Sequence, residues 1–235
     1  MAQNQRFDNT LVVNDAIASE DIACSPAYRV PCVVTYPSAI KRTFDIICSA
    51  ILLFLGMPFF VIIIALLKLL SPGPAIFKQE RIGLEGRRFF MYKFRTMVED
   101  AEDMLEDLKI LNPAGPFMIK IPHDPRVIGR FAKFLRKSGI DELPQLWNVF
   151  RGQMSLVGPR PLPLPEGVSL YYDEQARQRY GVPPGISGLW QITHRHSLDY
   201  QDLIRCDMSY IKRRSMLLDL TILAKTLPAI IKDFT

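Results

Sequence analysis

Two adjacent carboxylates, Asp141 and Glu142, stand where the sequence predicts the start of a helix. Apolar residues recur at helical spacing after them, and Pro144 is tolerated only in a first turn, so the helix should begin near Ile140 or Asp141. At a helix N-terminus the peptide dipoles would keep a carboxylate ionised, and free backbone N–H groups suit a phosphate. This placement suits phosphoryl-transfer chemistry.

Basic residues lie just upstream of this pair, at Arg130, Lys133, Arg136 and Lys137. Ionised carboxylates beside cations that hold an anionic substrate could form a site for phosphoryl transfer, in which positioning and charge stabilisation do most of the work. An acidic N-cap next to surface basic residues is the alternative, since Asp is strongly preferred at N-caps. The pattern alone leaves both interpretations open.

Two segments rich in Gly and Pro each frame a polar or cationic residue: residues 152–161 read GQMSLVGPRP and residues 182–191 read VPPGISGLWQ. Such segments form loops of fixed shape, where binding residues tend to lie. Arg160 stands between two prolines, so its guanidinium could bind a phosphate or a base edge at little ordering cost. An ordinary turn with a surface arginine is the alternative.

The elements that must position these residues begin with an uncharged apolar run from Ile46 to Leu67. Roughly 20 helical residues cross a hydrocarbon core of about 30 Å. Basic residues on both flanks place both ends on the cytoplasmic face, and Pro58 beside Gly56 interrupts a helix. The pattern favours a re-entrant helix-break-helix that enters and leaves by one face. A single kinked span is the alternative.

The rest of the chain predicts a mostly helical α+β fold. Short β-like stretches at 75–77 and 88–92 flank Leu84-Glu85-Gly86 and predict a small β-hairpin. Apolar residues at helical spacing predict amphipathic helices from Val98 to Leu111 and from Met216 to Ile231. The first has an acidic face that suits solvent. The second could lie in the core or at a membrane interface.

Composition restricts the class of partner. The 235 residues carry a net charge of +5, which indicates an anionic partner: phospholipid head groups, nucleotide phosphates or nucleic acid. The polar N-terminus is unlike a secretory signal. The cysteines are scattered without metal-type spacing, which is typical of reduced thiols in a cytosol-facing protein. They are Cys24, Cys32, Cys48 and Cys206.

From about Lys41 onward the chain resembles the bacterial sugar transferase family, the monotopic polyprenol-phosphate sugar-1-phosphate transferases that start exopolysaccharide and other glycan synthesis. The matching strings, in the family's order, are KRTFDIICSAILLF, FKQERIG, FMYKFRTM, HDPRV, LRKSGIDELPQLWNVFRGQMSLVGPRP, PGISGLWQI and SMLLDLTILAKTLPAI. With the composition, the resemblance implies a polar tail (1–38), a re-entrant membrane helix (39–70) and a compact, membrane-associated catalytic domain (71–235) with amphipathic interfacial helices. It also implies a monotopic protein on the cytoplasmic face of the bacterial inner membrane.

The resemblance makes Asp141 and Glu142 the catalytic dyad. It implies that Asp141 attacks the β-phosphate of a UDP-sugar, releases UMP and holds the sugar phosphate covalently until undecaprenyl phosphate accepts it. Glu142 would help to bind Mg²⁺, a hard cation that accepts carboxylate and phosphate oxygens. The resemblance further implies a phosphate- or nucleotide-binding role for four basic residues: Lys93, Arg95, Arg136 and Arg160.

The family's membrane helix usually breaks at a Ser-Pro pair, whereas this chain has Met57-Pro58, so the depth of the bend is left open. His194 and His196 lack a third ligand nearby, so no zinc site is expected, although they could contribute to substrate selectivity. Expected partners are a UDP-sugar, undecaprenyl phosphate and membrane phospholipid, with a homo-oligomer left open. The sequence does not disclose the sugar.

Two other classes of function compete with the enzyme. A membrane-anchored nucleic-acid-binding protein would account for the basicity and the two tryptophans, but a dense Lys/Arg tract is lacking, so no nucleic acid is expected. A non-catalytic scaffold that recruits glycan enzymes would have no need of an intact dyad. Release of UMP from UDP-sugars distinguishes the enzyme from both.

Overall fold

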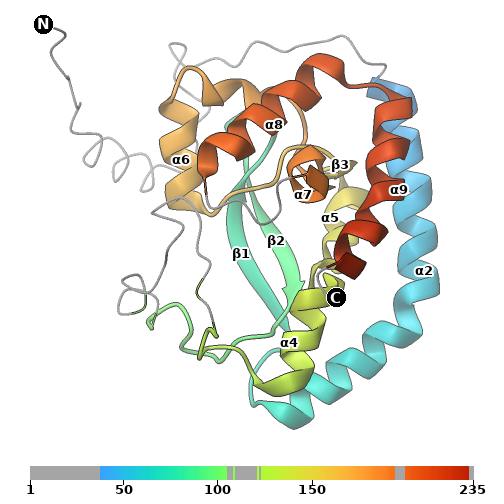
Figure 1. Cartoon of the computed structure of the whole chain (residues 1–235). Coiled ribbons are helices and arrows are strands. Elements are labelled where there is room, and N and C mark those ends of the chain that lie inside the picture. The colour runs from blue at the N-terminus through green and yellow to red at the C-terminus, as the bar shows by residue number, and fades with distance from the viewer. Residues whose placement is uncertain (1–37, 105–107, 109–120, 122, 194–198, 233–235) are drawn as a thin grey trace, which may run out of the picture.

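The computed structural model describes residues 38–104, 108, 121, 123–193 and 199–232. The predicted tail (1–38), apart from Ser38, lies outside the described residues, as do His194 and His196. Figure 1 shows a central hairpin with helices gathered around it and a long helix along one side.

That long helix, α2 (Ser38–Leu70), contains Pro58 and continues through it without interruption. The predicted helix-break-helix is therefore wrong in one respect: a bend, visible in Figure 1, replaces the break. A proline removes one backbone hydrogen bond and can kink a helix without ending it. Within the described residues, α2 is the one helix long and apolar enough to cross a membrane. Its re-entrant path stays a prediction.

The predicted hairpin is confirmed. Strands β1 (Ile76–Ile82) and β2 (Arg88–Phe94) pair in antiparallel fashion, joined by the 3₁₀ helix η3 (Leu84–Gly86). Gly86 has φ +81°, and a Cβ atom there would lie 2.7 Å from the ring of Tyr171, so this turn requires glycine. Lys93 lies near the end of β2.

The predicted helix start near Ile140 needs correction. Helix α4 (Gly129–Ser138) ends at Gly139, a 3₁₀ turn η5 (Ile140–Glu142) follows, and the α-helix α5 begins only at Gln145 and ends at Arg151. An α-helix starting at Ile140 would need an N–H at Pro144 to reach the Ile140 carbonyl, and proline has none. The chain instead bonds Leu143 N to Ile140 O at 3.1 Å. Both dyad residues therefore lie on η5.

The predicted helix over 98–111 is wrong at its start. Residues 99–104 form turns, Leu108 is helical and donates a 3.3 Å hydrogen bond to the Met104 carbonyl, and most of the remainder lies outside the described residues. Four of the six residues at 99–104 are acidic, at Glu99, Asp100, Glu102 and Asp103. Like charges three and four residues apart destabilise a helix, which opposes the apolar spacing.

The two Gly/Pro-rich segments pair with each other. Strands β3 (Ser155–Val157) and β4 (Gly185–Ser187) run parallel. A Cβ atom on Gly185 would collide with the backbone of Gly158. The two segments approach this closely only because both residues are glycines. The remaining elements are α6 (Leu164–Tyr172), η6 (Ala176–Gly181), α7 (Leu189–Thr193), α8 (Tyr200–Arg213) and α9 (Met216–Lys232). The predicted C-terminal helix is thus confirmed as α9.

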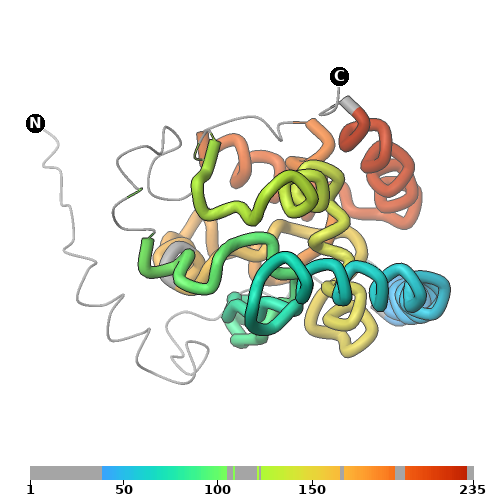
Figure 2. Tube along the Cα trace, turned by 90° about the horizontal axis from the view of Figure 1, so that it is seen from below, coloured from blue at the N-terminus to red at the C-terminus, as the bar shows by residue number. Residues whose placement is uncertain are grey.

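Polar contacts hold the start of α2 to the rest of the molecule. Arg42 donates hydrogen bonds to the carbonyl oxygens of Val149 and Phe150, at the end of α5. Lys41 Nζ lies 2.8 Å from Asp45 Oδ1 and 3.1 Å from Asp219 Oδ2 on α9. Figure 2 shows α5 lying beside α2. The apolar helix is therefore fixed to the element that follows the dyad.

The far end of α2 contacts the same folded unit. Leu67 is 1% exposed and packs with Ala75, Phe94 and Leu135. Arg95 Nη2 donates a 2.9 Å hydrogen bond to the Ser71 carbonyl, just past the last turn. Between these attached ends most of the apolar side chains of α2 are exposed.

Candidate active site

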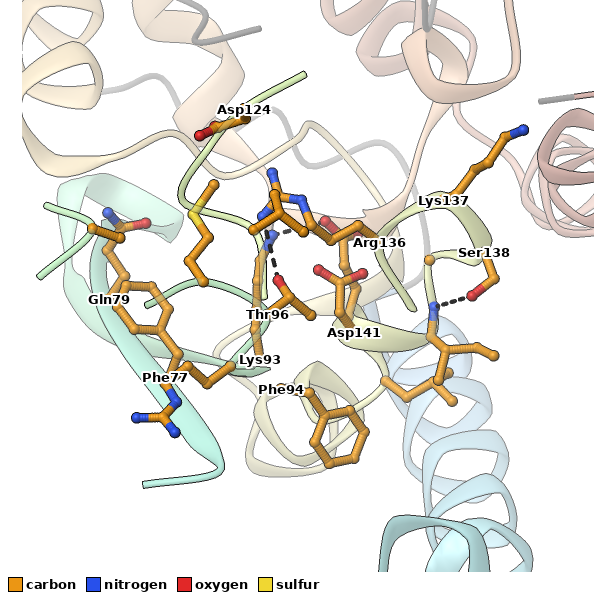
Figure 3. A pocket seen from close by; sticks show the side chains of 18 of the residues that line it. Phe77, Gln79, Lys93, Phe94, Thr96, Asp124, Arg136, Lys137, Ser138 and Asp141 are labelled. Atoms are coloured by element: carbon orange, nitrogen blue, oxygen red, sulfur yellow. Dashed lines mark hydrogen bonds and ion pairs between the residues drawn. The ribbon is translucent and has the colours of Figure 1, made fainter. Parts of the chain in front are cut away.

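A large cavity opens beside the dyad. Its wall is formed by the hairpin, α4, η5, the loop around Arg160, α7 and α9. Figure 3 shows Lys93, Arg136 and Asp141 directed toward the same space. The structure therefore brings together residues that lie more than 60 positions apart in sequence, from Lys93 to Arg160.

Glu142 is held by two cations. Lys93 Nζ donates a 2.8 Å hydrogen bond to Glu142 Oε1, and Arg160 Nη2 donates to the same oxygen at 2.7 Å. The second guanidinium nitrogen of Arg160 lies 3.5 Å from Glu142 Oε2. Because hydrogen bonds between ionised groups are the strong ones, this carboxylate is fixed in orientation.

The Asp141 carboxylate, unlike that of Glu142, has no cation bound to it among the described residues. Its residue is 7% exposed, and in the described part of the chain no group donates a hydrogen bond to its carboxylate, which faces the cavity. A carboxylate without fixed partners is free to reach an incoming atom. Two neighbouring acids thus differ in availability: Glu142 is bound and Asp141 is free to react.

The pKa values of the pair diverge accordingly. Burial, reinforced by the charge of Glu142, raises the pKa of Asp141 to about 6. Burial also disfavours the charged form of Glu142, but the adjacent Arg160 and Lys93 outweigh it and hold the pKa of Glu142 well below its usual range. Burial lowers the pKa of Lys93. Neighbouring carboxylates with pKa values pushed apart are typical of catalytic sites.

The other two predicted basic residues, Arg136 and Arg95, differ in their hydrogen-bond partners. Arg136, on α4, donates a 3.3 Å hydrogen bond from Nη1 to Thr96 Oγ1, and its charge lowers the pKa of Asp141. Arg95 lines the cavity as well, but its guanidinium bonds the end of α2 rather than the dyad. The structure therefore groups Lys93, Arg136 and Arg160 with the dyad.

Two residues that sequence reasoning missed support Arg160. Arg179, on η6, donates a 2.7 Å hydrogen bond from Nη2 to the Arg160 carbonyl. Its Nε and Nη2 also bond Asp207 Oδ2, at 3.0 and 2.8 Å. Both side chains are buried, and burial raises the pKa of Asp207 to about 6. Neither residue stood in a predicted motif, so no sequence signal pointed to the pair.

The two carboxylates of the dyad are also the candidate protein ligands for a metal ion. In the described ranges no group of three or more His, Cys, Asp or Glu residues is arranged to hold one. Mg²⁺ does not need such a cage, because it usually takes one or two carboxylates and completes its shell with water and substrate phosphates. The oxygen donors of Asp141 and Glu142 fit that partial set.

Comparison with known proteins gives the family context. Residues 36–233 match the model of the family described as bacterial sugar transferase. The exopolysaccharide production protein ExoY of Rhizobium meliloti is 39% identical over 194 residues, which cover 81% of this chain and 84% of ExoY. All predicted site residues lie within the range that matches the family model.

Two longer relatives are also similar. The undecaprenyl-phosphate galactose phosphotransferase of Salmonella typhimurium is 36% identical over 82% of this chain and 40% of its own length. The UDP-N-acetylgalactosamine-undecaprenyl-phosphate N-acetylgalactosaminephosphotransferase of Aeromonas hydrophila is 37% identical over 83% of this chain and 44% of its own. The chain thus spans less than half of these two relatives.

Proposed function

Because the chain belongs to the bacterial sugar transferase family and is a sugar-phosphate transferase, we propose that it moves a sugar-1-phosphate from a UDP-sugar to undecaprenyl phosphate. UMP is the other product. The reaction passes through a covalent aspartyl-phosphosugar intermediate and begins the membrane steps of exopolysaccharide or other glycan synthesis. The observation that carries the mechanism is the contrast between Asp141, without hydrogen-bond donors from the described residues, and Glu142, bound by Lys93 and Arg160.

In the first step a carboxylate oxygen of Asp141 attacks the β-phosphorus of the UDP-sugar. A new P–O bond forms to Asp141, and the bond from the β-phosphorus to the bridging oxygen breaks. That oxygen leaves with its electron pair on UMP. In the second step an oxygen of the lipid phosphate attacks the same phosphorus, and the Asp141 carboxylate leaves. The two displacements balance without an oxidant or reductant.

The cations around the dyad can stabilise the negative charge of the phosphate groups in this reaction. Lys93 and Arg160 converge on Glu142, and Arg136 lies within electrostatic reach of Asp141. Phosphoryl transfer depends on positioning and on stabilising charge at the phosphoryl oxygens, for which a planar arginine and a lysine are suited. Mg²⁺ bound to Glu142, with Asp141 nearby, would offset phosphate charge.

The apolar surface supports action at a bilayer. Both ends of α2 are attached to one folded unit while its middle is exposed, which favours re-entry over a straight span. Trp147 and Phe150 on α5, stacked at 5.7 Å, are also exposed, as are Leu217 and Leu227 on α9. We place this surface in the cytoplasmic face of the bacterial inner membrane, beside the head groups that include the lipid phosphate.

The test uses the full chain in detergent micelles, with Mg²⁺ and UDP-sugars labelled in the β-phosphate. Without lipid acceptor the protein should become labelled and release about one equivalent of UMP per active site, the burst expected of a covalent intermediate. Asp141→Asn should abolish labelling, since an amide of nearly the same shape is a poor nucleophile. Glu142→Gln should slow labelling and weaken its Mg²⁺ dependence.

Added undecaprenyl phosphate should discharge the label into lipid. A panel of UDP-hexoses and UDP-N-acetylated sugars identifies the donor. Full labelling of Asp141→Asn would assign the nucleophile to another residue. Ternary-complex kinetics with no labelled protein would remove the covalent step and leave the overall transfer intact.

A further inference from the structure

One glutamine in the cavity wall lacks hydrogen-bond partners. The amide of Gln191, on α7, is buried, and neither Nε2 nor Oε1 has a partner in the described part of the chain. Buried polar groups in folded proteins are nearly always paired with protein or ordered water. An amide left with both a free donor and a free acceptor therefore calls for a ligand or another explanation.

The neighbouring hydroxyl groups do not supply the missing partners. Ser187 Oγ and Thr226 Oγ1 lie on the same wall, 2.6 Å from each other. Thr226 Oγ1 also bonds the Ile222 carbonyl at 2.8 Å. These two side chains satisfy each other, so they do not supply the hydrogen bonds that the Gln191 amide lacks.

The free amide lies at the base of the Arg160 loop. A Cβ atom on Gly188 would be 2.7 Å from Gln191 Oε1 and would also collide with the carbonyl oxygen of Gly158. Gly158 stands two residues before Arg160, whose guanidinium binds Glu142. Glycine at position 188 thus leaves room for the Gln191 amide close to the loop that leads to the dyad.

We propose that Gln191 binds the sugar nucleotide and helps to select it, a role that rests on the proposed function. Its side-by-side donor and acceptor fit a ligand edge that offers one acceptor and one donor in return. The imide edge of uracil and a pair of adjacent sugar hydroxyls share this chemistry. The ligand supplies the two hydrogen bonds that the protein leaves unmade, and substrates without such an edge leave the amide buried and unpaired.

The experiment compares wild type with Gln191→Leu, which keeps the approximate size but removes both hydrogen-bonding groups. Titration calorimetry of the purified full chain in micelles with Mg²⁺ measures the affinity for UDP-sugar and for UMP, with Asp141→Asn in all proteins compared so that the donor binds without releasing UMP. The UDP-sugar dissociation constant should rise roughly 10- to 100-fold in the variant, as expected for the loss of one or two buried hydrogen bonds. The melting temperature without ligand should stay equal or rise, because an unpaired buried amide has been removed.

The UMP titration distinguishes the two halves of the donor. An equal loss of UMP affinity assigns the contact to the nucleotide, whereas unchanged UMP affinity with weakened UDP-sugar binding assigns it to the hydroxyls of the transferred sugar. Gln201→Leu, on the exposed start of α8, is the matched control and should bind both ligands as wild type does. Gln191→Glu provides a second variant with the amide donor removed.

Unchanged affinity for UDP-sugar in both Gln191 variants would overturn the proposal. A lower melting temperature in Gln191→Leu with unchanged affinity would show that the amide serves only the fold. Failure of the proposed function has a separate signature, because wild type itself would then release no UMP from any UDP-sugar.

Discussion

Adjacent residues can carry the same functional group and yet behave differently. Asp141 and Glu142 share one 3₁₀ turn, but only Glu142 meets cations directly, whereas Asp141 is buried beside its charged neighbour. Burial raises the pKa of Asp141 to about 6, which still leaves it ionised at neutral pH. The sequence predicted an ionised nucleophile from a helix dipole. In the structure burial and the charge of Glu142 oppose that ionisation, whereas the charges of Lys93, Arg136 and Arg160 favour it.

The raised pKa of Asp141 predicts how kcat/KM falls at low pH, which is the acidic limb of the pH profile. In the proposed mechanism Asp141 must lose a proton to attack, so kcat/KM should fall as pH drops through about 6 and level off above it. The charge of Glu142 raises the pKa of Asp141, so Glu142→Gln should move the limb to lower pH, whatever its effect on the maximum rate. Initial rates of UMP release between pH 4.5 and 8 (about ten points) measure the limb.

Asp207 is the control for this assignment, since burial raises its pKa to about 6 as well. The limb should remain in Asp207→Asn if it reports Asp141. A limb that vanishes in Asp207→Asn but stays in place in Glu142→Gln would contradict the assignment to the dyad.

The buried Arg179 predicts a positioning effect on Arg160. Arg179→Lys keeps the charge but loses the fork that joins the Arg160 carbonyl to Asp207. We expect KM for the UDP-sugar to rise about 10-fold with a smaller change in kcat, since the loop shifts while Asp141 does not. Steady-state kinetics give the two constants separately.

Arg177→Lys is the matched control, because Arg177 bonds the Tyr171 and Tyr172 carbonyls instead of the Arg160 loop. It should leave KM near the wild-type value. Equal effects of the two substitutions on KM would mean that Arg179 acts through general stability of η6 rather than through Arg160.

At the scale of elements, the sequence predicted best where a local rule decides. Turn chemistry at Leu84-Glu85-Gly86 predicted the hairpin, and apolar spacing predicted α9. The tolerance of proline in a first turn does not predict the start of α5, because the hydrogen bond that Pro144 cannot make favours a 3₁₀ turn before it. The pairing of β3 with β4 depends on two glycines far apart in sequence, which no local pattern reveals.

The candidate site shows the same division. Motif strings pointed to the dyad, Lys93 and Arg160, which the structure groups together, whereas Arg95 stands in the same string as Lys93 and bonds the end of α2. Residues two apart face the same way only within a strand, and β2 ends at Phe94, between Lys93 and Arg95, so the string alone does not show that the two side chains diverge. Buried pairs such as Arg179 and Asp207 form only through tertiary contact.

The attachment of α2 predicts a large loss of stability on removal of one cation. Lys41 bridges two buried carboxylates, Asp45 and Asp219, which are 3% and 0% exposed. Lys41→Met would leave both without this partner, and breaking a buried ion pair typically costs roughly 3–5 kcal/mol. The free energy of unfolding in micelles, from denaturant titration, should fall by about that amount.

Lys68→Met, at the exposed opposite end of the same helix, should change the unfolding free energy little. Replacing Asp219 by Asn in the Lys41→Met background should recover part of the loss. Equal stability of Lys41→Met and wild type would show that the contact is not stabilising.

For the whole molecule, the two attached ends of α2 predict topology. In a variant without the four native cysteines, single cysteines at positions 39 and 71 should both react with a membrane-impermeant reagent only from the cytoplasmic side. Reaction from opposite sides would contradict re-entry. Pro58→Leu should straighten α2 and lower activity, since the catalytic unit would lose its alignment with the head groups.

The short helix α5 acts as a spacer of fixed length. Its seven residues span about 10 Å, with the dyad turn shortly before its first residue and the Arg42 contacts at Val149 and Phe150 in its last turn. In the proposed mechanism α5 thus holds the nucleophile at a set height relative to α2, and an acceptor is recognised by the position of its phosphate rather than by its hydrocarbon tail. Polyprenyl phosphates of very different tail length should therefore be comparably good acceptors once they are in the bilayer.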